Sequence, residues 1–412
     1  MKSDSIQIQD WTKWKKIVSP AVDKKTAFYR WYLYKHGYSR ELVHNIIDQM
    51  QIKAGQSILD PFCGGGTTLL AASEKGINSV GYDIMPFPTF VSNTKLLRPK
   101  ISEIEKYERI FTVGNIRKVK GTFKTDIITL KRAFDTKTLN FLFKFRRKID
   151  SIENKDVKKV MLLSFLKNLE KIGRAKKTGG FLRIDPDKKI LSSKEIVKNF
   201  KITVSEIIED LKANPLPLSG AAKAFVGDSR NIPNREKFDA IISSPPYPNR
   251  HDYTRVYLLE EAFGFLEDNA AIKKLRYKTL RSHVEARKQF EVSNYSQPED
   301  LKKVIKLLSG KKLNNSKITE MLEGFFEDMF LTLQSAKSNL KKGGKVGFVI
   351  SNARYAGIPV EADKILLELG ESAGLKPEGI YMLRNRGNSY QQELKFQRDP
   401  ARESLVVWNT KN

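Results

Sequence analysis

The chain has 412 residues, with 74 lysines and arginines against 47 aspartates and glutamates, and a formal net charge of +27. This length accommodates a catalytic domain with insertions. The charge argues against an enzyme of small neutral metabolites and suits a protein that neutralises phosphate groups. One cysteine excludes an internal disulfide and favours a reducing compartment. The N-terminal segment has no apolar core and no apolar run is long enough to span a bilayer, so neither signal peptide nor membrane span is expected.

The first informative segment, residues 57–72, reads SILDPFCGGGTTLLAA and predicts a strand, a glycine-rich turn and a helix. Glycines let a ligand approach the backbone, and the helix N-terminus offers free N–H groups. The spacing matches neither the dinucleotide motif G-x-G-x-x-G nor a P-loop, which needs a lysine. A second predicted strand ends at Asp83, where an acid can accept hydrogen bonds from ribose hydroxyls. Loop and acid together predict an adenosine-containing ligand that needs no pyrophosphate.

A lysine-rich insertion, residues 101–215, separates the second predicted strand from the third and reads as mostly helical. Phenylalanines with helix-like spacing alternate with basic residues between positions 115 and 148, and we interpret them as the core of the insertion. The charges are interpreted as contacts to nucleic-acid phosphates. The segment GRAKKTGGFLR, at 173–183, reads as a basic glycine loop. The candidate phosphate contacts are Lys131, Arg132, Lys144, Arg146, Arg147 and Lys148.

The fourth predicted strand, residues 238–244, ends in the tetrapeptide Ser244-Pro245-Pro246-Tyr247. It presents a hydroxyl, a backbone carbonyl and an aromatic ring, which suit holding a planar base and accepting hydrogen bonds from its exocyclic amine. The alternative is a tight Pro-Pro turn with a packing tyrosine.

The remaining chain continues the alternation of strands and helices, with a second insertion at 267–318 that contains LRSHVEAR. Further strands are predicted at 345–351, 379–383 and 404–408, and helices at 320–340 and 361–373. Alternation of this kind predicts an α/β fold with a mainly parallel sheet. The expected divisions are 1–100 with the glycine motif, the basic insertion 101–215, 216–266 with the tetrapeptide, the insertion 267–318, and 319–412.

The pair DPFCGGGTT and Ser-Pro-Pro-Tyr resembles the amino-methyltransferases of DNA, which use S-adenosyl-L-methionine to methylate cytosine N4 or adenine N6. The resemblance covers both motifs and the strands around them. It implies a seven-stranded Rossmann-like methyltransferase sheet, mostly parallel with an antiparallel final strand, plus the helical basic insertions. It also implies double-stranded DNA as partner, a prokaryotic cytoplasm and, as a possible companion, a separately encoded cognate restriction endonuclease. Either insertion is a candidate for reading the DNA sequence.

Residue roles follow from the same resemblance. Ser244 Oγ and the carbonyl of Pro245 would accept hydrogen bonds from the target amine, and Pro246 completes the motif. Tyr247 would stack on a base flipped out of the duplex. The expected cofactor residues are Asp60 for the methionine ammonium, Phe62, Gly64 and Gly66 for the methionine side, Asp83 for the ribose and Asp228 for the adenine amino group. For Asp228 a plain strand-end Asx turn is the alternative.

Several activities remain open. Serine in place of aspartate or asparagine at position 244 favours cytosine N4, with adenine N6 as the alternative. RNA methylation and a non-catalytic nucleic-acid-binding module are weaker alternatives. Methylation at C5 of a pyrimidine is disfavoured, because it needs a thiolate in the base pocket and Cys63 lies in the cofactor loop. Four scattered histidines and one cysteine predict no metal site, and no oligomeric state is predicted.

Overall fold

A computed structural model describes residues 7–214, 219–234, 236–386 and 400–410 of the chain. Its main sheet has eight strands in the order β1-β11-β12-β8-β7-β2-β3-β6. Neighbours pair in parallel, except that β12 is antiparallel to both β8 and β11. The strands are β1 (Ile8–Asp10), β2 (Ser57–Asp60), β3 (Asn78–Asp83), β6 (Ala222–Val226), β7 (Phe238–Ser243), β8 (Leu340–Ser351), β11 (Lys376–Arg386) and β12 (Ala401–Asn409).

The predicted methyltransferase sheet is confirmed, and β1 adds one strand to it. All seven predicted strands are present, and the antiparallel one is the last, β12. Strand β1 pairs with β11 at the sheet edge. It spans only three residues, too few to show the apolar alternation by which a strand is predicted.

The central strands are apolar because both of their faces are covered. On β7, Ala240 and Ile242 pack into the core with α1 (Arg40–Gln49), whereas Ile241 packs into the core with α14 (Ile318–Ser338) and α15 (Ala362–Ser372). Successive side chains of a strand point to opposite faces, so this run fills two cores at once. Helix α2 (Thr67–Glu74) begins directly after the glycine turn, and α3 (Pro86–Lys95) follows β3 with a proline in its first turn.

The first insertion is a helical unit whose core is continuous with the residues of α3 that pack against it. Phe134, Phe141 and Phe145 are buried in this core, which confirms the interpretation for these three phenylalanines, whereas Phe123 and Phe143 are half-buried. An upstream segment joins this core, since Trp31 donates its indole N–H to Asp210 on α9 (2.9 Å). The helices are α4 (Ile101–Arg109), α5 (Val113–Arg117), α6 (Ile128–Ala133), α7 (Thr136–Asp150), α8 (Lys155–Ile172) and α9 (Ser193–Ala213).

The segment expected as a glycine loop forms an antiparallel hairpin instead. Strand β4 (Ala175–Thr178) pairs with β5 (Phe181–Ile184), and Gly179 and Gly180 make the turn between them. Each strand has four residues, and their lysines and arginine hide the alternation that would mark a strand.

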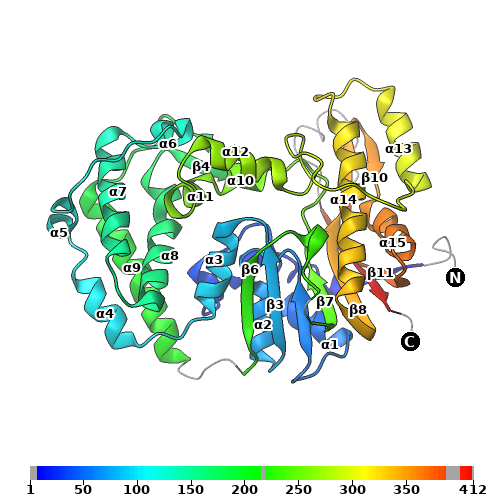
Figure 1. Cartoon of the computed structure of the whole chain (residues 1–412), viewed down its shortest axis with the longest axis horizontal. Coiled ribbons are helices and arrows are strands. Elements are labelled where there is room, and N and C mark those ends of the chain that lie inside the picture. The colour runs from blue at the N-terminus through cyan, green and yellow to red at the C-terminus, as the bar shows by residue number, and fades with distance from the viewer. Residues whose placement is uncertain (1–6, 215–218, 235, 387–399, 411–412) are drawn as a thin grey trace.

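Strand β7, which leads into the Ser-Pro-Pro-Tyr motif, is followed by α10 (Tyr253–Val256) and α11 (Leu258–Gly264), and the second insertion adds α12 (Asn269–Lys278) and α13 (Glu299–Ser309). In Figure 1 the helical insertion forms one end of the molecule, and α13 and α14 lie at the other, near the small hairpin of β9 (Ala353–Tyr355) and β10 (Ile358–Val360). Helices α10 and α12 lie above the sheet between these ends, and strand β4 lies beside α6. Among the described residues, no helix combines the length and apolarity of a bilayer span.

Candidate active site

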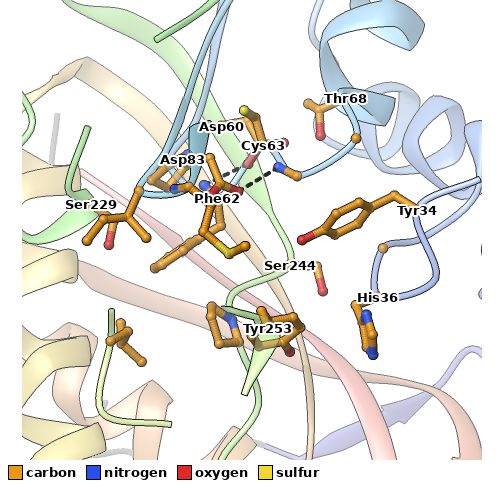
Figure 2. Close-up of a pocket in the computed structure, with 18 of the residues that line it drawn as sticks. Tyr34, His36, Asp60, Phe62, Cys63, Thr68, Asp83, Ser229, Ser244 and Tyr253 are labelled. Carbon is orange, nitrogen blue, oxygen red and sulfur yellow. Dashed lines mark hydrogen bonds between the residues drawn. The ribbon is translucent and has the colours of Figure 1, made fainter. Parts of the chain in front are cut away.

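The two sequence motifs meet at one cavity. Strands β2 and β7 are parallel neighbours, with Leu59 opposite Ile241, so the residues that follow them emerge at the same sheet edge. The cavity there is lined by both motifs, by the turns after β3 and β6, and by two segments from elsewhere in the chain. Figure 2 shows Asp60, Asp83 and Phe62 on one side and Ser244 and Tyr253 on the other.

Asp60 joins the two motifs directly. Its Oδ1 accepts a hydrogen bond from Ser243 Oγ at the end of β7 (2.5 Å) and another from the backbone N–H of Phe62 (3.1 Å). Burial raises the pKa of Asp60 to about 6, although these hydrogen bonds oppose the shift. The bond between the two strand ends fixes the start of the glycine loop relative to Ser244.

Asp83 has a similar place at the end of β3. Its carboxylate accepts hydrogen bonds from the N–H groups of Gly64 (3.1 Å) and Met85 (2.9 Å), so it orders the glycine loop and the turn before α3. Burial raises the pKa of Asp83 from 3.8 to about 7. The side chain also lines the cavity, and a ligand that donates hydrogen bonds to it would stabilise its charged form.

The glycines of the loop are needed for packing against neighbouring residues. A Cβ on Gly65 would lie 2.6 Å from Cβ of Tyr34, and a Cβ on Gly66 would lie 2.8 Å from Oγ of Ser92 on α3. Gly66 also has a φ of +78°, which favours glycine. Gly64 and Gly65 line the cavity, whereas Gly66 is not among its lining residues.

Asp228 lines the cavity and is also held in the turn after β6. Its carboxylate accepts hydrogen bonds from the backbone N–H (3.0 Å) and the guanidinium (2.8 and 2.6 Å) of Arg230. Arg230 is itself buried and pairs with Asp328 on α14 (2.9 Å). The turn therefore forms as the Asx alternative expected, while the side chain remains at the wall of the cavity.

The four residues of the Ser-Pro-Pro-Tyr motif differ in their position relative to the cavity. Ser244 and Pro246 line the cavity, but Pro245 and Tyr247 are not among its lining residues. The Tyr247 hydroxyl lies 3.3 Å from Ser244 Oγ and donates to Glu403 on β12 (2.7 Å), and its ring packs against the core beneath α14. Tyr253, six residues further on, is the aromatic residue of this region that lines the cavity.

Two segments that line the cavity were not predicted. In the first, residues 34–38, Tyr34 stacks on Tyr257 with ring centroids 4.6 Å apart, and His36 lies near Tyr253. The second is Thr279–Ser282, part of the second insertion, and includes the start of LRSHVEAR. The only sequence signal for the first segment was its density of aromatic residues, YRWYLYKHGY, which has no periodicity.

The basic candidates lie on two helices of the insertion. Lys131 and Arg132 are exposed on α6, whose end is joined to the hairpin because Arg174 donates its N–H to the Ala133 carbonyl (2.8 Å). On α7, Arg146 pairs with Asp150, Lys144 donates to the carbonyl at the end of α5, and Arg147 donates to a backbone carbonyl of the loop that follows α5. Lys148 is the remaining candidate on α7. In Figure 1 helix α6 lies near β4, and α7 lies further from the sheet.

Comparison with known proteins gives consistent matches. Residues 4–88 match the model of a DNA methylase family. The chain is 32% identical to the Type II methyltransferase M.BsoBI of Geobacillus stearothermophilus, over 96% of this chain and 88% of that protein. It is 30% identical to the Type II methyltransferase M.AvaI of a Nostoc species, over 96% of this chain and 89% of that protein.

Proposed function

The chain belongs to the amino-methyltransferases of DNA, and we propose that it methylates the N4 amine of cytosine at specific sites in duplex DNA. Its cofactor is S-adenosyl-L-methionine. The observation that carries the cytosine assignment is Ser244, which heads the catalytic motif and lines the same cavity as the glycine loop. A serine there, in place of the aspartate or asparagine more frequent in adenine enzymes, favours N4 of cytosine.

The residues of the cavity fit this cofactor. Asp83 offers a half-buried carboxylate to the ribose hydroxyls; desolvation raises its pKa to about 7, and hydrogen bonds donated by a ligand would oppose that shift. Phe62 supplies an aromatic wall, Gly64 and Gly65 leave space at the loop, and Asp60 and Asp228 are the acids proposed for the ammonium and adenine amino groups. When bound, S-adenosylmethionine supplies an electrophilic methyl group.

The chain's own contribution to the reaction is to hold and activate the target amine. An exocyclic amine is a weak nucleophile because its lone pair is delocalised into the ring. Ser244 Oγ and the Pro245 carbonyl accept its two N–H hydrogen bonds and draw the lone pair out of conjugation, with no covalent intermediate. The bond between Asp60 and Ser243 maintains the distance between the amine site and the glycine loop.

A base inside a duplex cannot reach this cavity, so it is flipped out of the stack. We propose stacking on the flipped base for Tyr247, as expected from the motif, and Tyr253 is a second aromatic candidate because it lines the cavity. Lys131 and Arg132 are proposed to bind DNA phosphates. For the basic candidates on α7, phosphate binding stays a prediction. On the basis of the family resemblance, we also propose a separately encoded cognate endonuclease as a companion and a cytoplasmic location.

The target atom can be identified by digesting methylated plasmid DNA to nucleosides and separating them by mass. We expect N4-methyl-2′-deoxycytidine. N6-methyl-2′-deoxyadenosine without N4-methyl-2′-deoxycytidine would overturn the cytosine assignment, and methylated RNA with unmodified DNA would overturn the substrate class.

The role of Ser244 is tested by Ser244→Ala. Loss of one preorganised hydrogen-bonding group at a reacting centre lowers turnover about 10²–10³-fold, while calorimetry should give an S-adenosylhomocysteine affinity near that of the wild type. Native turnover in this variant would refute the proposed amine site.

A further inference from the structure

The β4–β5 hairpin carries an exposed face with an unusual composition. Lys176 lies directly opposite Arg183 in the register, and both side chains are exposed. Like charges opposite each other destabilise an antiparallel pair, so this pairing favours the binding of an anion between or above them. Alternate residues of a strand share a face, so Phe181 points to the same side as Arg183.

Phe181 stands at the tip of this face and is 53% exposed. A single exposed apolar side chain is ordinary on a protein surface. Here, however, the ring lies at the tip of a hairpin whose two strands carry the exposed cations Lys176 and Arg183 behind it. An aromatic tip next to a pair of cations suits a partner with stacked rings and phosphates.

The opposite face of the hairpin is fixed to the protein. Lys177 forms a buried ion pair with Glu260 on α11 and donates to the Tyr32 hydroxyl (2.8 Å). At the turn, a Cβ on Gly180 would lie 2.6 Å from the ring of His251, four residues after Tyr247 in the catalytic loop. The hairpin is therefore held against the residues that follow the catalytic motif.

The tip lies at the rim of the cavity. The Gly179 carbonyl is 2.9 Å from Nε2 of His36, a residue that lines the cavity. The His36 ring is 5.0 Å from that of Tyr253, and Figure 2 shows both near Ser244. A duplex whose target base enters the cavity would consequently pass close to Phe181.

We propose that the β4–β5 hairpin opens the duplex: Lys176 and Arg183 bind a backbone phosphate, and Phe181 inserts into the base stack where the target base has left. This inference rests on the proposed function and assigns the opening of the duplex to Phe181. Apolar side chains inserted between base steps are an established means of unstacking DNA. The inserted ring would stabilise the open duplex by replacing the stacking that the flipped base gives up.

The test compares wild type, Phe181→Ala and Phe181→Trp on two duplexes that contain the methylated site, located beforehand by modified-base sequencing. One duplex is fully paired, and in the other the target base faces an abasic position and has no pairing to lose. Because flipping a paired base costs most, Phe181→Ala should methylate the paired duplex about tenfold or more slowly. On the second duplex it should approach the wild-type rate, and Phe181→Trp should be active on both. Ile202→Ala is the matched control, since Ile202 is 48% exposed on α9 of the same insertion.

A second readout does not depend on methyl transfer. A fluorescent cytosine analogue at the target position brightens when it leaves the stack, and this rise should be smaller with Phe181→Ala in the presence of S-adenosylhomocysteine. Lys176→Ala or Arg183→Ala should reduce the salt dependence of DNA binding by about one unit of slope.

The outcomes separate the inference from the proposed function. If wild type methylates DNA but Phe181→Ala matches it on the paired duplex, or is equally slow on both duplexes, the hairpin inference is wrong and the proposed function stands. If wild type methylates neither duplex, the proposed function and the inference both fail.

Discussion

Replacing Asp83 by asparagine should weaken cofactor binding by a predictable amount. A hydrogen bond to a charged group contributes about 1.5–3 kcal/mol, and each 1.4 kcal/mol is about tenfold in affinity. The expected loss in affinity for S-adenosylhomocysteine is therefore about 10- to 150-fold. The asparagine oxygen can still accept from Met85, but its amide nitrogen then faces the N–H of Gly64, which is also a donor. The glycine loop loses a hydrogen bond as well.

The same residue should make cofactor affinity depend on pH. Because the pKa of Asp83 is raised to about 7, wild type should lose up to about tenfold in affinity per pH unit below 7, where the carboxyl is protonated. Asp83→Asn should lack this slope. Asp60, with a pKa of about 6, should add a second decrease below pH 6 in both proteins.

The effect of Asp83 on stability has the opposite sign. A raised folded-state pKa favours the protonated folded protein, so this contribution is present below the ordinary value of 3.8 and is lost as the pH rises through about 7. Asp83→Asn should remove that part of the pH dependence of unfolding. Because binding and stability change in opposite directions with pH, the two effects can be distinguished.

Calorimetric titration with S-adenosylhomocysteine between about pH 5.5 and 8.5 measures the binding effect. The matched control is Asp239→Asn, which also removes a carboxylate that accepts a backbone N–H bond, from Ser57 (2.8 Å), but at the start of β7. We expect the control to bind the cofactor product as wild type does. An Asp83→Asn affinity within twofold of wild type, or an unchanged slope near pH 7, would refute the ribose assignment.

Three further predictions follow from packing and charge. Gly65→Ala should lower stability by about 1–3 kcal/mol, because its Cβ meets the Cβ of Tyr34 rather than a movable chain end; an unchanged melting temperature would contradict this. Lys177→Met should lower the free energy of unfolding, measured in urea, by about 3–5 kcal/mol, because it leaves Glu260 buried without the cation of its ion pair. The double variant Lys177→Met with Glu260→Gln should recover part of this loss, and no recovery would exclude the ion pair as the cause. Replacing Lys131 and Arg132 by alanine should weaken DNA binding equally across sequences and lower its salt slope by about two, as measured by fluorescence anisotropy; a change confined to one sequence would indicate base reading instead.

The sequence by itself determined seven strands of the main sheet and the position of the candidate active site within it. Short apolar runs that end in turn residues mark strands locally, and parallel strands of such a sheet bring their carboxyl ends to one edge. Asp60, Phe62, Gly64, Asp83 and Ser244 could therefore be assigned to one cavity before any contact was known. The phenylalanines of the insertion were also predictable, because burial follows their helical spacing.

Only the tertiary structure decided which other residues complete the site. Residues 34–38 and Thr279–Ser282 line the cavity through packing with distant elements, and no local period marks such contacts. The hairpin reaches the rim through a contact between His36 and Gly179, which are 143 residues apart in the chain. The glycine loop is a second example. Its sequence indicates that other atoms approach its backbone closely, but only the fold shows that Ser92 approaches Gly66 while Gly64 and Gly65 line the cavity. A chain of this length can bring many segments to one cavity, and long-range packing alone selects among them.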